Sequence, residues 1–76
     1  MLNHREFCKR LRQARHNAGM SGQQVADVLC TTQAVISRYE LGERIPNIDR
    51  VAELAMLYGV SIDWLCGLDG GKTDEG

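Results

Sequence analysis

The sequence predicts one small all-α domain of five short helices without strands. Apolar residues recur at helical spacing along most of the chain, and no stretch alternates apolar and polar residues for long. Pro46 is the only proline, and glycine, hydroxyl and amide residues separate the apolar runs. With 76 residues, of which 43% are hydrophobic, the chain can bury one thin core. It is too short for a barrel or a doubly wound sheet.

The first two predicted helices span about 5–17 and about 22–29. The first carries an apolar stripe at helical spacing: Phe7, Leu11, Ala14 and Ala18. Gly19 ends this helix. Ser21 is predicted to cap the second helix, with Gln24 as its capping-box partner. The buried face of the second helix is predicted to be apolar: Val25, Ala26 and Leu29.

A tight turn at Cys30 and Thr31 leads to the third predicted helix. This helix is capped by Thr32 or by Thr31, and it runs to about Leu41. Gly42 closes it. The predicted span is therefore 32–41.

Asn47 is predicted to cap the fourth helix, which stops at Gly59. Its apolar stripe is expected to contain five residues: Ile48, Val51, Leu54, Ala55 and Tyr58. Ser61 caps a last short helix, whose inward-facing residues are Ile62, Leu65 and, as a further candidate, Trp64. Tyr58 and Trp64 are predicted core anchors, with an exposed dimer patch as the alternative.

Charge is distributed unevenly along the chain, although the net charge is -1. Residues 1–45 hold seven basic and four acidic side chains, whereas residues 46–76 hold two basic and six acidic ones. A basic half beside an acidic half suits a protein that presents one face to a polyanion. Residues 1–69 are predicted to form the domain, and the glycine-rich, charged residues 70–76 are predicted to form a flexible tail.

Several classes of protein are not supported by the residues. Cys8, Cys30 and Cys66 are widely spaced, so the sequence indicates free thiols in a reducing compartment. His4 and Cys8 could share a helix face, but two ligands do not make a metal site. No catalytic triad or phosphate loop stands out, so neither an enzyme nor a cofactor is expected. No apolar run could span a membrane and no secretory signal is visible, so we expect a cytoplasmic protein.

The segment 22–41 has the form of a helix-turn-helix unit. Small Ala26 allows the two helices to cross closely, while Ile36 and Tyr39 turn the second helix towards the core. The opposite face of the second helix is then free: Gln33, Ala34, Ser37, Arg38 and Leu41. A helix with such a polar face can enter the major groove of DNA.

The chain resembles the phage repressor and Cro type of helix-turn-helix regulators, the Xre family. Four stretches carry the resemblance, in order and at the family's spacing, between Leu11 and Gly67: LRQARHNAGMS, QQVADVL, TTQAVISRYELGERIPN and VAELAMLYGVSIDWLCG. The resemblance implies a five-helix, phage-repressor-like DNA-binding domain. Such proteins usually act as dimers on palindromic operators.

The resemblance also implies roles for individual residues. The residues that fall at positions of DNA contact are Ser21, Gly22, Gln23, Thr31, Thr32, Gln33, Ala34, Ser37, Arg38, Leu41 and Arg44. Arg15 and Glu40 fall where the family often has a partly buried ion pair between the first helix and the recognition helix. A simple surface pair is the alternative for these two residues.

The sequence departs from the family pattern at four positions. Gly22 stands where the family often has a Gln whose side chain contacts phosphate. The backbone N–H of Gly22, at the start of a helix, can still donate a hydrogen bond to a phosphate. Cys30 stands where the turn often has Gly, and a left-handed Cys30 would cost about 1 kcal/mol. Glu43 stands where the family often has a basic residue, and Leu41 stands where it has a polar one. We therefore expect the protein to bind DNA phosphates with modest affinity.

The function predicted from these observations is that of a sequence-specific regulator, a repressor that binds double-stranded DNA as a homodimer. The alternative is an antitoxin or a protein-interaction adaptor of the same fold, with a toxin or an anti-repressor as its protein partner. A third possibility is one domain cut from a longer repressor, against which the start at Met1 and the expected tail argue mildly. No membrane partner is expected.

Overall fold

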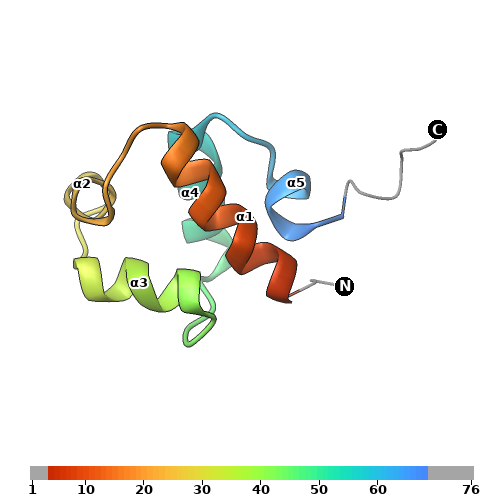
Figure 1. Ribbon diagram of the computed structural model, residues 1–76, viewed down its shortest axis with the longest axis horizontal. Coiled ribbons are helices and arrows are strands. Elements are labelled where there is room, and N and C mark those ends of the chain that lie inside the picture. Colours follow the sequence, from red (N-terminus) through yellow and green to blue (C-terminus); the bar gives the residue numbers. More distant parts are fainter. Residues whose placement is uncertain (1–3, 69–76) are drawn as a thin grey trace.

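A computed structural model of the chain describes residues 4–68. The predicted all-α class is confirmed. Five helices follow one another and no strand occurs within this range (Figure 1): α1 (His4–Asn17), α2 (Gly22–Val28), α3 (Gln33–Leu41), α4 (Ile48–Tyr58) and α5 (Ile62–Cys66). None of these helices is long and apolar enough to cross a membrane. The predicted tail, 70–76, lies outside the described residues.

The starts of α2 to α5 are fixed by side chains one residue before each helix. Ser21 Oγ accepts a hydrogen bond from the backbone N–H of Gln24 at 3.1 Å, and Gln24 Oε1 accepts one from the Ser21 N–H at 2.8 Å. The predicted capping box is therefore present. Thr32, not Thr31, caps α3. Asn47 and Ser61 cap α4 and α5 as predicted.

α1 is the central element of the fold. It packs against α3, α4 and α5, while α2 packs on α3 and α4 packs on α5. Figure 1 shows α1 crossing in front of α4, with α2 and α3 on one side and α5 on the other. These helices enclose a single apolar core: Phe7, Leu11, Ala14, Val25, Ala26, Ile36, Tyr39, Val51, Leu54, Ala55, Tyr58 and Leu65. Tyr58 is thus a core residue.

Three predicted core positions are wrong. Ile48 is 68% exposed and Ile62 is 36% exposed. Each is the first residue of its helix, ahead of the turns that other helices cover, so its side chain remains in solvent. Ala18 is also exposed, because α1 ends at Asn17 and Ala18 already lies in the following turn.

Trp64 is half-buried rather than enclosed in the core. The Arg10 guanidinium lies 5.0 Å from the centre of the Trp64 ring, and its Nη1 donates a hydrogen bond of 2.6 Å to the Trp64 carbonyl. Arg10 Nε also donates to Glu6 at 2.8 Å. This arginine therefore ties α5 to α1, a contact that helical periodicity does not predict.

Candidate nucleic-acid interface

The turn between α2 and α3 is tight and is held from two sides. The Thr31 N–H donates to the Ala26 carbonyl at 2.9 Å. Arg50, from α4, donates through Nη1 to the Leu29 carbonyl at 3.0 Å. Between them Cys30 adopts a left-handed conformation with φ 57°. Cys30 therefore has the strained backbone that the sequence analysis considered, which costs about 1 kcal/mol for a residue with a Cβ.

α3 has one buried and one exposed face. Ile36 and Tyr39 enter the core. The opposite face carries the side chains that the sequence predicts to be free, and all are exposed: Gln33, Ala34, Ser37, Arg38 and Leu41. Thr32, the N-cap of α3, is exposed as well. The structure thus brings the main part of the predicted site together on one helix surface of polar, apolar and cationic groups.

The start of α2 lies beside this exposed face. A Cβ added to Gly22 would lie 3.4 Å from Gln33 Cγ, so the backbone of α2 approaches α3 closely here. Ser21 and Gln23 are exposed. Gln23 Nε2 donates to Asp27 Oδ1 at 2.8 Å, which holds that amide along α2. Within residues 4–68, the Gly22 N–H has no acceptor, as expected for the first residue of a helix.

Two predicted site residues lie away from the exposed face of α3. Thr31 is half-buried in the turn. Arg44 is exposed in the loop after α3, and its backbone N–H donates to the Arg38 carbonyl at 3.3 Å. This bond keeps the backbone of the loop close to the last turn of α3.

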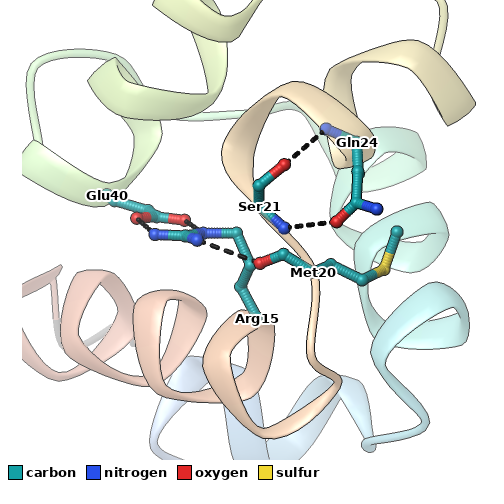
Figure 2. Close-up of polar contacts among 5 residues, drawn as sticks. All are labelled: Arg15, Met20, Ser21, Gln24 and Glu40. Carbon is teal, nitrogen blue, oxygen red and sulfur yellow. Dashed lines mark hydrogen bonds and ion pairs between the residues drawn. The ribbon is translucent and has the colours of Figure 1, made fainter.

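Arg15 and Glu40 form an ion pair between α1 and α3 (Figure 2). Arg15 donates through Nε and Nη2 to the two Glu40 carboxylate oxygens at 2.7 and 3.0 Å, and its Nη1 donates to the Met20 carbonyl at 3.0 Å. The side chains are only 15% and 11% exposed. The hydrogen bonds to Glu40 raise the pKa of Arg15 above its ordinary value. The pair fixes α3 and the segment before α2 relative to α1.

Tyr58 lies in the same part of the core. Burial, supported by the negative charge of Glu40, raises its pKa to about 12. Burial likewise raises the pKa of the Cys8 thiol and of the Cys66 thiol. All three cysteines are free. No group of three or more metal-ligating side chains occurs in the part of the chain that the structure describes.

Sequence reasoning did not place two cations next to this surface. Lys9 and Arg12 are exposed on α1 and line a groove that Glu40 of α3 also lines. Their spacing of three residues indicates that both lie on one side of a helix, and this was the only sequence pattern that pointed to them. It could not indicate that this side of α1 is adjacent to α3.

The fold and this surface are those of a helix-turn-helix protein. The helix-turn-helix family model matches residues 11–65 of the chain. The chain belongs to this family, of the Xre type. Proteins of the family are DNA-binding regulators and not enzymes.

Three regulators of Bacillus subtilis (strain 168) are similar to the chain. The HTH-type transcriptional regulator ImmR is 39% identical over 61 residues, which cover 80% of this chain and 48% of ImmR. An SPbeta prophage-derived uncharacterized HTH-type transcriptional regulator, YonR, is 36% identical over 59 residues, 78% of this chain and 55% of YonR. The uncharacterized HTH-type transcriptional regulator YobD is 34% identical over 62 residues, 82% of this chain and 55% of YobD. The chain spans about half the length of the curated relatives it matches.

Proposed function

We propose that this protein is a sequence-specific transcriptional regulator, a repressor that places α3 in the major groove of a palindromic operator. The exposed face of α3 carries this proposal. Its side chains project from a helix that Arg15 and Glu40 fix against α1. A rigid helix with a free polar face is the element that reads base edges in this class of protein.

Two side chains of this face supply most of the direct readout in our proposal. Arg38 offers a planar fork that matches O6 and N7 of guanine, and Gln33 can bond N6 and N7 of adenine. Ala34 lies one residue further along and offers a methyl group to thymine. Ser37 completes the polar part of the surface.

In our proposal Thr32, Gly22 and Arg44 position the duplex through its phosphates. Thr32 and the free N–H of Gly22 stand at helix starts, where backbone dipoles favour an anion. Arg44 offers a cation beyond the other end of α3. In our proposal a homodimer places two copies of α3 about one turn of DNA apart, ~34 Å.

Affinity selection of sheared genomic DNA, followed by sequencing, tests the proposal. We expect enrichment of a two-fold symmetric motif. Arg38→Lys is the matched control for Arg38→Ala, because it keeps the charge and removes the fork. We expect both variants to lose preference at one position of each half-site. A motif that both variants select unchanged would rule out the role of Arg38.

One observation favours a second candidate function, an antitoxin or a protein-interaction adaptor. Leu41 is 70% exposed at the end of α3, and Glu43 follows in the loop. An apolar and acidic end of the surface suits a protein partner better than it suits phosphate. Absence of any enriched motif in the selection would favour this function over DNA binding.

A further inference from the structure

We propose that the exposed basic side of α1, formed by Lys9, Arg12 and His16, binds the phosphate backbone of DNA beside the recognition helix. We call this surface the α1 basic face. The inference rests on the proposed function, because it assumes that a duplex lies on α3. It extends the DNA-binding surface beyond the helix-turn-helix unit to a helix that contributes no base readout.

The α1 basic face lies beside α3. Residues at i, i+3 and i+7 share one side of a helix, and all three members of the α1 basic face are exposed. With Cys8, Gln13 and Asn17 they line one wall of an open groove, and Glu40 of α3 lies on the other side. α1 lies close to the end of α3, since a Cβ added to Gly42 would lie 3.3 Å from Cys8 Sγ.

The positive charge of the α1 basic face is not neutralised by carboxylates among residues 4–68. Among residues 4–68, Glu40 supplies the only carboxylate that lines the groove, and two hydrogen bonds from Arg15 hold it. It is therefore already compensated. Neither Lys9 nor Arg12 has an ion-pair partner among residues 4–68. Two uncompensated cations side by side form a surface that attracts a polyanion.

The groove beside the α1 basic face is continuous with α3, which favours DNA over a free anion or an acidic protein as the ligand. Ser37 stands one turn before Glu40 on α3, so the groove wall runs directly into the exposed face of α3. A duplex seated on α3 would carry a strand of phosphates past that edge. Lysine and arginine contacts to phosphate position a protein on DNA without reading sequence.

The salt dependence of DNA binding tests whether Lys9 and Arg12 contact phosphates rather than bases. Affinity would be measured over a range of salt concentrations for two duplexes, the selected operator and a scrambled sequence. For Lys9→Gln and for Arg12→Gln we expect the slope of log K against log salt to become shallower by about 0.9 for each phosphate that the variant no longer neutralises. The change should be the same on both duplexes, and the selected motif should remain unchanged.

Met56→Glu is the matched control. It lowers the net charge by one, as each test variant does, at an exposed position of α4 that does not line the groove. Far-ultraviolet circular dichroism would show that each variant is folded. Slopes for Lys9→Gln and Arg12→Gln that equal the Met56→Glu slope would overturn the inference.

The two duplexes separate this inference from the proposed function. If the protein selects no motif but the test variants still change the salt slope on scrambled DNA, sequence-specific regulation fails and the α1 basic face stands. In the opposite outcome the operator is bound, Arg38→Ala weakens that binding, and the salt slopes of the test variants equal the slope of Met56→Glu. Sequence-specific regulation then stands and the α1 basic face fails. If the protein binds neither duplex, both the proposed function and the α1 basic face are overturned.

Discussion

Arg15 holds Glu40 through two hydrogen bonds that run from α1 to α3, across 25 residues of sequence. Both side chains are largely withdrawn from water, so each charge depends on the other for compensation. The third hydrogen bond, to the Met20 carbonyl, extends the same anchor to the segment that leads into α2. The pair therefore adds a polar anchor to the core contacts that Ile36 and Tyr39 of α3 already make.

Loss of either partner should destabilise the domain. We expect Arg15→Ala and Glu40→Ala each to lower the free energy of unfolding by about 3 kcal/mol, because a poorly solvated charge is left behind. A double-mutant cycle from urea unfolding should give a coupling energy of about 1–3 kcal/mol. The pair Arg50 and Glu53, whose charged atoms lie 3.3 Å apart and in which Glu53 is 56% exposed, is the control. A coupling energy no larger than that of this pair would contradict the prediction.

The left-handed turn residue offers a stabilising substitution. Cys30→Gly should raise the free energy of unfolding by up to about 1 kcal/mol, since glycine adopts positive φ without steric cost. In a domain of this size that corresponds to roughly 4–8 °C in Tm. Cys30→Ala removes the thiol but keeps the Cβ, so it should not share the gain. Equal Tm values for the two variants would show that the backbone at Cys30 is unstrained.

Tyr58 should make the domain sensitive to alkali. Its pKa is raised from an ordinary 10.0 to about 12 in the fold. Below pH 10 the phenol is protonated in both the folded and the unfolded state and has no effect. Between about pH 10 and 12 the unfolded chain ionises first, so the free energy of unfolding falls as pH rises. Tyr58→Phe should weaken that fall when urea unfolding is followed over this pH range; a parallel decline in both proteins would refute the assignment.

Arg10 should determine how α5 sits on α1. Arg10→Ala removes a charge-assisted hydrogen bond to the Trp64 carbonyl and the cation above the ring, and we expect the free energy of unfolding to fall by about 1.5–3 kcal/mol. Trp64 is the only tryptophan, so its emission reports on this site alone. We expect a red shift in Arg10→Ala that Arg10→Lys partly reverses. An unchanged spectrum would mean that α5 stays in place without the arginine.

The cost of losing Arg38 should depend on the DNA. On the selected operator Arg38→Ala should weaken binding by about 1–3 kcal/mol, the usual value of one bidentate base contact. On a scrambled duplex the loss should be smaller and equal to that of any single phosphate contact. Titration of both duplexes at one salt concentration provides the measurement. Equal losses on the two duplexes would assign Arg38 to phosphate rather than to a base.

Local features of the fold could be predicted from the sequence because they depend on neighbouring residues. The N-caps at Ser21, Asn47 and Ser61 involve contacts over three residues, and so does the choice of Thr32 over Thr31, which the sequence left open. Burial at helix starts was not predictable in this way. Whether another helix covers a first turn depends on how the helices are placed in space, which periodicity alone does not contain.

In the candidate site, too, local features could be predicted from the sequence and contacts between helices could not. The free face of α3 follows from the spacing of its core residues, whereas the pairing of Arg15 with Glu40 came from the family resemblance. No local pattern relates Gly22 to Gln33 or α1 to the end of α3. The α1 basic face could be recognised only when the helices were placed together, since its charge matters through its distance from another element.

The N-caps have a consequence for the lifetime of the protein. Each of α2 to α5 begins with a contact between residues three apart, so helix formation needs no long loop to close. Helical domains built mainly on local contacts fold in roughly microseconds to milliseconds. When reclosing is faster than cleavage, proteolysis follows the equilibrium population of the open state. Under that condition the rate at which a protease cleaves this protein should follow its free energy of unfolding, so relief of the strain at Cys30 should slow cleavage.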